Sequence, residues 1–410
     1  MTEYIAALQN GRNVPKEDKI FGISSRAKAM AAEKGDEAVV NATIGTLLDD
    51  EGNLMVLSSV AETFSALTAE EYASYAPIGG IPSYKEAVIR AALGSYQPKG
   101  YVEVCATPGG TGAIRNTIAN YSAPGDKVLI GDWHWSPYGT IASEIGRKIE
   151  TFTMFTEEGT FNTDAFCKKT DDILKEQSHL VIILNTPAHN PTGYALSDEE
   201  WRRITEYLSG LSGGKTVALL IDAAYIDFAG DEEKYRSFLP ITENLPANVL
   251  PIIAYSMSKT FTLYGMRTGA ALCIAKTKEI AEEFRRVFEF SSRGSWSNCA
   301  KAGQSIIARI YEDEALLSKV TEERKEIRDM LLARGKAFEE AAGKVGLEIV
   351  PFDAGFFVSI PCENPDEISR RLEKEGIFLV PLAKGLRVSV ASVSEKVCGM
   401  LPEKILAAMK

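Results

Sequence analysis

The sequence predicts an α/β protein: a large domain with a seven-stranded, mainly parallel sheet between helices, and a smaller α+β domain. Several β-rich runs are continuously apolar, such as LVIILN and VALLID, which is typical of strands covered on both faces. Helical patterns such as SDEEWRRITEYLSG separate most of these runs and indicate βαβ crossovers. The predicted strands are Tyr101–Ala106, Lys127–Gly131, Ile149–Met154, Leu180–Asn185, Val217–Asp222, Val249–Ser256 and Gly269–Ala275.

The end of this series and the C-terminal part of the chain differ from the βαβ pattern. The last two strands are joined by about a dozen residues without a clear helix, so one strand is expected to run antiparallel. A long charged helix, roughly Glu312 to Ala342, then leads into further strand segments. We therefore predict an N-terminal arm and part of the small domain over residues 1–45, a large domain over 46–308 and a small domain over 309–410.

Composition limits the possible partners. The chain has 410 residues, with 45 Lys and Arg against 56 Asp and Glu, a net charge of −11, and no basic run. A nucleic-acid partner is therefore not expected. No apolar stretch approaches the ~20 residues of a membrane helix, and the first residues lack the layout of a signal peptide. We expect a cytoplasmic protein that does not bind membranes.

Cysteine and histidine usage argues against metal chemistry. The six cysteines are scattered without a C-x-x-C pair, which favours reduced thiols, and no two of the three histidines have metal-ligand spacing. No metal site is predicted, so the chemistry must come from an organic cofactor or a carboxylate.

The segment AYSMSKTFTLYGMRTG carries the strongest chemical signal. A predicted strand ends at Ser256 and Ser258, Lys259 follows directly, and Arg267 comes eight residues later. Two hydroxyls and a guanidinium suit a phosphate dianion, because arginine can bind phosphate through two parallel hydrogen bonds. A lysine beside such a site can form an imine with a carbonyl cofactor. The alternative is a solvated loop lysine, which this setting disfavours.

A glycine-rich turn, TPGGTGAIR, is predicted to open a helix at about Thr111. Gly109, Gly110 and Gly112 let the backbone approach an anion, and the free N–H groups of a helix N-terminus favour phosphate. Alone such a turn is weak evidence. Together with the two serines and the arginine it predicts a phosphate site.

Asp222 closes the apolar strand VALLID, so its carboxylate is expected to be partly buried and to need a cationic partner. One interpretation is a helix N-cap. The other is that Asp222 holds the pyridinium nitrogen of a cofactor, whose ring then accepts electrons from a substrate carbanion. Tyr225, three residues later, can donate to the phenolate oxygen of that ring. The turn pattern NTPAHNPTGY contains Asn190, whose amide can donate to an oxygen of the ligand.

Unusual residues cluster after the ends of five predicted strands. In a doubly wound sheet, ligands lie beyond the carboxyl ends of the strands. The sequence therefore predicts one site built from Gly109–Gly112, Trp135, Asn190, Asp222 with Tyr225, and Ser256–Lys259.

These motifs together resemble the fold type I aminotransferases. SMSK with its downstream arginine, NPTG, D-x-A-Y, GGTGAIR and YAPIGGIPSYKEAV occur in family order from about Asn41 to Arg387. The chain looks most like the aspartate and aromatic amino-acid aminotransferases. The resemblance implies the PLP-transferase fold type I and pyridoxal 5′-phosphate (PLP) as cofactor.

The resemblance also implies residue roles. Lys259 forms the Schiff base and acts as the base in the proton shift, Asp222 pairs with the pyridine nitrogen, and Tyr225 and Asn190 bind the 3′-oxygen. The other cofactor-binding residues are Gly110, Thr111, Ser256, Ser258 and Arg267 at the phosphate, Trp135 stacked on the ring (with Trp133 as a competing candidate), and Tyr75 reaching the neighbouring subunit of a homodimer. The substrate-binding residues are Gly45 and Arg387 at the α-carboxylate, Asn190, and Arg293 at a distal carboxylate in the partner's site.

Three positions depart from the family pattern. Gly109 replaces the usual serine of the glycine-rich turn, Tyr138 stands where a histidine often flanks the stacking tryptophan, and Asn185 replaces a histidine of the aspartate enzymes. These differences argue against strict aspartate specificity. A surface or interface ion pair is the alternative interpretation of Arg293.

We therefore expect PLP-dependent transamination between an L-amino acid, aspartate or aromatic, and a 2-oxo acid such as 2-oxoglutarate. Two alternatives use the same cofactor: a lyase or decarboxylase on the same scaffold, and a non-catalytic PLP-binding sensor. Arg293 favours transamination, because the acceptor of the second half-reaction is commonly a dicarboxylate. The first 40 residues are too few for the DNA-binding module of a sensor.

Overall fold

The computed structural model describes residues 6, 8 and 18–410, so much of the predicted N-terminal arm lies outside the described residues. The chain divides into two compact units. Unit 1 comprises Met1–Met55, Ala188–Ala195 and Glu326–Lys410, and unit 2 comprises Val56–Pro187 and Leu196–Lys325. The domain borders predicted after residues 45 and 308 stay a prediction.

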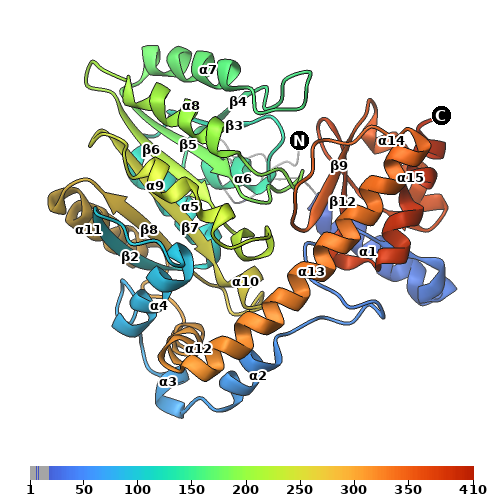
Figure 1. Ribbon diagram of the computed structural model, residues 1–410, viewed down its shortest axis with the longest axis horizontal. Coiled ribbons are helices and arrows are strands. Elements are labelled where there is room, and N and C mark those ends of the chain that lie inside the picture. The colour runs from blue at the N-terminus through green and yellow to red at the C-terminus, as the bar shows by residue number, and fades with distance from the viewer. Residues whose placement is uncertain (1–5, 7, 9–17) are drawn as a thin grey trace. The chain divides into compact units, whose positions relative to one another are not determined.

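Unit 2 is built on a seven-stranded sheet with the order β2-β8-β7-β6-β5-β3-β4 (Figure 1). β8 runs antiparallel to both of its neighbours, and the other neighbouring pairs are parallel. The strands are β2 (Tyr101–Pro108), β3 (Lys127–Gly131), β4 (Lys148–Phe152), β5 (His179–Asn185), β6 (Thr216–Asp222), β7 (Val249–Ser256) and β8 (Thr268–Ala275). The predicted α/β fold class and the predicted antiparallel strand are confirmed.

Helices cover both faces of this sheet (Figure 1). Side chains of α5, α6 and α11 pack on one face in a single apolar cluster, and α7 and α8 lie on the other side. The helices of unit 2 are α2 (Ser58–Ser65), α3 (Ala69–Ala73), α4 (Pro82–Leu93), α5 (Gly109–Tyr121), α6 (Pro137–Glu144), α7 (Thr163–Glu176), α8 (Asp198–Ser209), α9 (Phe238–Thr242), α10 (Met257–Thr260), α11 (Lys278–Ser295) and α12 (Lys301–Glu312), with the 3-10 turns η2 (Ile226–Phe228) and η3 (Lys234–Arg236).

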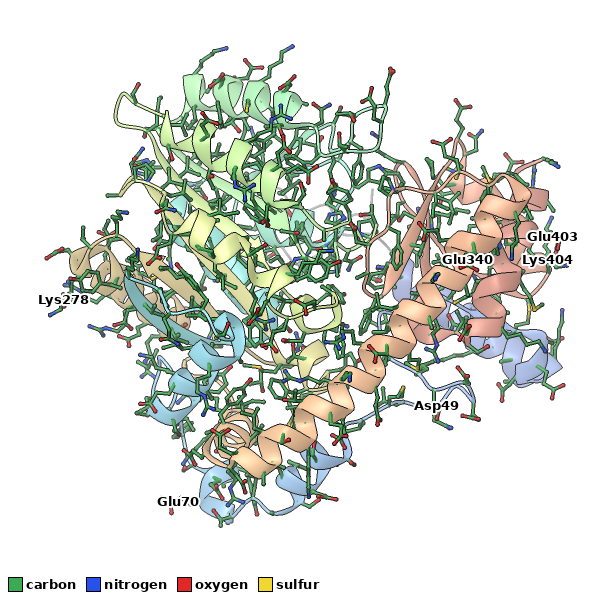
Figure 2. The ribbon with its side chains drawn as sticks, viewed as in Figure 1. Asp49, Glu70, Lys278, Glu340, Glu403 and Lys404 are labelled. Carbon is green, nitrogen blue, oxygen red and sulfur yellow. The ribbon has the colours of Figure 1, made fainter. Side chains whose placement is uncertain are left out.

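The sequence explains these elements locally. All residues of β7 and β8 are buried, as expected for inner strands covered on both faces. α8 begins with a capping box in which the Ser197 hydroxyl and the Glu200 carboxylate satisfy each other's backbone N–H groups. Charged side chains such as Glu70 on α3 and Lys278 at the start of α11 point outward at the periphery of the unit (Figure 2).

Unit 1 is a smaller α+β body. It contains a three-stranded antiparallel sheet, β11-β12-β9, and a two-stranded parallel sheet, β1-β10, with an apolar core of their side chains and those of the helices. Its elements are α1 (Lys19–Lys34), η1 (Asp36–Ala38), β1 (Val40–Asn41), β9 (Phe357–Pro361), α14 (Pro365–Lys374), β10 (Ile377–Phe378), β11 (Val380–Pro381), β12 (Gly385–Ser389), η4 (Val390–Ser392) and α15 (Glu395–Met409).

One long helix, α13 (Glu314–Val345), crosses the border between the units. It begins two residues after the predicted start, because Asp313 breaks the chain of helical hydrogen bonds and caps the new helix through its carboxylate. No helix among the described residues is both long enough and apolar enough to cross a membrane.

The packing of β8 on the start of α5 gives a first prediction. A Cβ atom at Gly269 would lie 2.5 Å from the carbonyl carbon of Gly109, a backbone atom that cannot rotate away. Gly269→Ala is therefore expected to destabilise the protein by roughly 1–3 kcal/mol, because overpacking forces the backbone to shift. Gly265→Ala is the control, because its Cβ would meet nothing within 4 Å. Urea unfolding of both variants checks this, and equal midpoints would contradict the packing argument.

Candidate active site

The predicted phosphate-binding residues converge at one edge of the unit 2 sheet. Ser256 ends β7, and Ser258 and Lys259 lie in the four-residue helix α10 that follows. Arg267 donates from Nη1 to the Ser258 hydroxyl (3.2 Å) and to the carbonyl oxygen of Tyr264 (2.9 Å). Arg267 has a φ of +52°, an uncommon conformation for a side-chain-bearing residue that is often found at functional sites.

The glycine-rich turn lies against the same residues. The helix α5 begins at Gly109, two residues before the predicted start at Thr111. A Cβ atom at Gly109 would lie 2.7 Å from Nη2 of Arg267, and one at Gly110 would lie 3.4 Å from Cβ of Ser256. The turn at Gly109 and Gly110 therefore packs closely against Arg267 and Ser256, an approach that glycine permits.

Asp222 lies at the end of β6 and is 5% exposed. Its Oδ2 accepts a hydrogen bond from the Tyr138 hydroxyl (2.5 Å), and among the described residues its buried Oδ1 has no partner. Burial raises the pKa of Asp222 to about 6, although the hydrogen bond from Tyr138 opposes this. The expected cationic partner is absent from the described residues, and Asp222 is not the N-cap of a helix there.

Tyr138 is thus part of the site, although its sequence position showed only a departure from the family's histidine. It is 1% exposed and lies 5.4 Å from the Trp135 ring in an edge-to-face arrangement. Burial, and then the charge of Asp222, hold the pKa of Tyr138 well above its usual value. Tyr138 therefore keeps its phenolic proton and acts as the donor to Asp222. Oδ1 of Asp222 stays open for another donor.

The amine of Lys259 lies over two aromatic rings. Nζ is 5.7 Å from the centroid of the Tyr225 ring and 4.7 Å from that of Tyr264. Such contacts favour a cation and restrict where the ammonium rests. Tyr225 could be predicted from the D-x-A-Y motif, whereas Tyr264 could not, because an aromatic residue in a loop carries no chemical signal of its own.

The other residues of unit 2 singled out from the sequence differ in their exposure and contacts. Asn185 donates from Nδ2 to the backbone carbonyl of Asp222 (2.7 Å), which fixes the end of β6. Trp133 is buried, whereas Trp135 is partly exposed next to Tyr138. Tyr75 is 90% exposed, and Arg293, in the last turn of α11, is exposed and donates to the Ser297 hydroxyl (2.6 Å).

Unit 1 brings together the residues predicted to bind the substrate carboxylate. Arg387 on β12 is 4% exposed and donates from Nη1 to Oδ1 of Asn190 (3.3 Å) and from Nη2 to the carbonyl oxygen of Thr43 (2.7 Å). Gly45 follows two residues after Thr43 in the same loop, and the guanidinium lies 4.3 Å from the ring centroid of Phe357.

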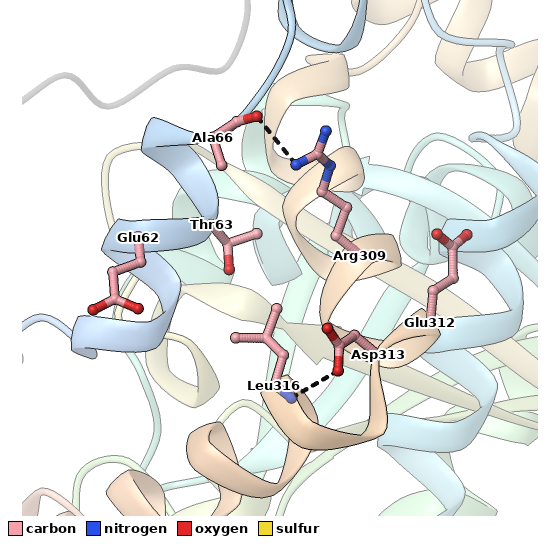
Figure 3. A pocket seen from close by; sticks show the side chains of 7 residues that line it. All are labelled: Glu62, Thr63, Ala66, Arg309, Glu312, Asp313 and Leu316. Atoms are coloured by element: carbon pink, nitrogen blue, oxygen red, sulfur yellow. Dashed lines mark hydrogen bonds between the residues drawn. The ribbon is translucent and has the colours of Figure 1, made fainter.

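Two hollows in unit 2 lie elsewhere. One, of about 450 Å³, lies between α2 and α12 (Figure 3) and is lined by Glu62, Thr63, Ala66, Arg309, Glu312, Asp313 and Leu316. The other, of about 500 Å³, is lined by Tyr96, Gln97, Lys99, Gly100, Pro240, Glu243, Asn244, Ala275 and Lys276. Neither is lined by a residue predicted for the site.

The residues of unit 2 fit PLP. An open, buried carboxylate oxygen suits a protonated ring nitrogen, and the serines, the arginine and the start of α5 suit a phosphate.

Residues 37–405 match the model of the family described as aminotransferase class I and II. The chain belongs to this family.

Known proteins resemble the chain along nearly its whole length. A solved aminotransferase from Anaerococcus prevotii is 38% identical, covers 99% of this chain and 100% of its own, and has a TM-score of 0.96. The aromatic-amino-acid aminotransferase of Paracoccus denitrificans is 28% identical over 95% of this chain and 96% of its own. The aspartate aminotransferase of Salmonella typhi is 27% identical over 90% and 93%. The predictions of fold, aminotransferase activity and PLP as cofactor are confirmed.

The raised pKa of Asp222 gives a prediction for the cofactor-free enzyme. Between pH 3.8 and about 6 the folded chain keeps a proton that the unfolded chain has lost, so its free energy of unfolding falls as the pH rises. Asp222→Asn does not titrate and still accepts from Tyr138. We expect the stability of this variant relative to the unsubstituted protein to grow by roughly 3 kcal/mol across this window.

Urea unfolding of both cofactor-free proteins at pH 4 and pH 7.5 measures that change. Since other carboxylates titrate equally in both proteins, they cancel in the difference. A difference that stays constant with pH would show that burial does not raise the pKa of Asp222.

Proposed function

We propose that this aminotransferase exchanges the amino group between an L-amino acid, dicarboxylic or aromatic, and a 2-oxo acid, with Lys259 as its central catalytic residue. The observation that carries the proposal is the arrangement around the sheet edge of unit 2: an open buried oxygen of Asp222, an anion-binding turn with Arg267, and an amine held over two aromatic rings. Relatives named for aromatic and aspartate substrates support this substrate range.

Asp222 would hold the cofactor ring. When bound, PLP supplies a ring that accepts electrons from the substrate carbon. Oδ1 of Asp222 would accept the N–H of the protonated ring nitrogen, while Tyr138 holds Oδ2 and keeps the carboxylate in one orientation. Trp135, next to Tyr138, is better placed than the buried Trp133 to stack on that ring. Tyr225 would donate to the ring oxygen.

The phosphate would be bound by the turn and the arginine together. Ser256 and Ser258 offer hydroxyls, Gly110 and Thr111 offer backbone N–H groups at the start of α5, and Arg267 offers charge. Lys259 would bind the cofactor carbonyl and then move a proton between the two carbons that exchange it.

Arg387, Asn190 and Gly45 of unit 1 are proposed to bind the substrate. A guanidinium is well suited to a carboxylate, which it can bind with two parallel hydrogen bonds. Both terminal nitrogens of Arg387 contact neutral oxygens of Asn190 and Thr43, so a carboxylate would be a stronger acceptor for them. Asn190 would also donate to the ring oxygen of PLP.

We also propose a homodimer in which Tyr75 and Arg293 serve the partner's site. Both are exposed in the single chain, and their segments are joined because Asn298 donates to the carbonyl oxygen of Ala76 (2.9 Å). Phe290, one turn before Arg293 on α11, is 83% exposed. A dimer interface would explain this group of exposed aromatic and basic side chains.

A cytoplasmic location is proposed from the acidic composition and the six free cysteines.

Lys259→Ala tests the central assignment. The variant should lose turnover, because no other group is proposed to move the proton, and should still bind PLP through the phosphate site. Borohydride reduction and peptide mapping of the unsubstituted enzyme should place the cofactor on Lys259. Trapping on a different lysine, or turnover by Lys259→Ala near that of the unsubstituted enzyme, would exclude the assignment.

Arg293→Ala tests the substrate range. Loss of the partner of a distal carboxylate should raise the activation free energy for aspartate by roughly 2–4 kcal/mol, which lowers kcat/KM about 30- to 1000-fold. The kcat/KM for phenylalanine should change little. Arg387→Ala should lower kcat/KM for both substrates, because every amino acid has an α-carboxylate. Arg286→Ala, an exposed arginine on the same helix, is the control. An equal loss for both substrates in Arg293→Ala would refute its role in specificity.

A further inference from the structure

A second buried carboxylate lies five residues after Asp222. The side chain of Asp227 in η2 is 7% exposed. Its Oδ2 accepts from the Tyr255 hydroxyl (2.6 Å) and from the Thr260 hydroxyl (2.7 Å), and its Oδ1 accepts from Nη2 of Arg236 (2.6 Å). The carboxylate is therefore bound on both oxygens.

Basic side chains compensate the charge of Asp227. Nη1 of Arg324 lies 3.8 Å from Oδ1, and the side chain of Arg236 is 4% exposed. Burial alone would raise the pKa of Asp227, but the two guanidinium groups and the hydrogen bonds outweigh it and hold the pKa below its usual value. Arg236 also donates to the carbonyl oxygens of Ala91 (2.9 Å) and Ala92 (3.1 Å) in α4. This anchors the carboxylate to the body of unit 2.

The partners of Asp227 are adjacent in sequence to the residues proposed for catalysis. Thr260 directly follows Lys259, Tyr255 directly precedes Ser256, and Asp227 comes two residues after Tyr225. Arg324 lies over the ring of Phe261, two residues after Lys259, at 5.4 Å. One carboxylate therefore ties together three segments, each of which bears a residue of the site.

The turn that carries Lys259 depends on such contacts. α10 has only four residues, so it has few hydrogen bonds of its own, and an isolated helix of this length is not stable. A movement of its backbone would carry the lysine amine away from the atoms between which it transfers a proton. A misplacement of about 1 Å can lower a rate by about 100-fold.

We propose that Asp227 is a positioning residue that holds the Lys259 turn in register with the Asp222–Tyr225 segment, through the Thr260 and Tyr255 hydroxyls. This inference rests on the proposed function of Lys259. Asp227 touches neither the cofactor nor the substrate in this scheme. Arg236 and Arg324 compensate the cost of burying the Asp227 charge. The hydrogen bond from Thr260 links Asp227 to the residue that directly follows Lys259.

The test uses Thr260, because Asp227→Asn would leave two buried arginines without their carboxylate and is expected to impair folding. Thr260→Val keeps the shape and removes the hydroxyl, and Thr260→Ser keeps the hydroxyl. Thr170→Val is the matched control: Thr170 is also fully buried, and its hydroxyl donates to a helical carbonyl in α7 (Phe166, 2.9 Å).

Thr260→Val should lower kcat by roughly 10- to 100-fold while KM and the dissociation constant of PLP change by less than about threefold. Thr260→Ser should restore kcat, and Thr170→Val should keep it despite a comparable loss of stability. In the cofactor-free proteins, hydrogen exchange of the amides of residues 257–262 should be faster in Thr260→Val than in the serine variant and the Thr170→Val control.

Equal kcat and equal exchange in Thr260→Val and Thr170→Val would overturn the inference alone. The proposed function is checked separately, by borohydride trapping in the unsubstituted enzyme. If Lys259 is not trapped there, the function and this inference fail together. Faster exchange with unchanged kcat would mean that Asp227 stabilises the turn without positioning the lysine, which also overturns the proposal.

Discussion

The buried carboxylate of Asp222 is the constraint on which the rest of the site depends. Burial opposes its charge, the neutral hydroxyl of Tyr138 donates to Oδ2, and no basic side chain among the described residues pairs with it. An unpaired buried charge is costly, so this carboxylate gains most from a ligand that brings a positive N–H. The end of β6, which carries this carboxylate, is held in place because Asn185 donates to the backbone carbonyl of Asp222. In the proposed complex, the binding free energy of the cofactor would include the relief of this desolvation penalty.

Asp227 shows the opposite solution only five residues away. There the penalty of burial is outweighed by Arg236 and Arg324 and by two hydroxyl donors, and the pKa falls. The same segment thus holds one carboxylate whose charge the protein compensates and one with a buried oxygen that has no partner among the described residues. Two buried carboxylates this close in sequence can have pKa values shifted in opposite directions, because each has a different set of partners.

The sequence predicted the sheet well, because alternating helix and strand patterns are local. Every predicted strand of unit 2 agrees with the structure within two residues at each end, and the Ser256–Lys259 segment follows β7 as expected. The network of Asp227 could not be predicted, because Arg324 is nearly a hundred residues away in sequence and only the folded chain brings it close. The hydrogen bond from Tyr138 to Asp222 could not be predicted for the same reason, because α6 supplies Tyr138 from a segment 84 residues away in sequence.

One departure from the family pattern, Gly109, is explained by the packing around it. Gly109 replaces a serine that would offer a hydroxyl, and the space of its missing side chain is taken by the guanidinium of Arg267, 2.7 Å from where a Cβ would lie. Gly109 itself has a φ of +69°, which a side chain would strain. A serine there would therefore have to displace Arg267 from its hydrogen bond to Ser258. Since arginine offers charge as well as donors, the proposed phosphate site would need one hydroxyl fewer, provided that Arg267 stays in this position.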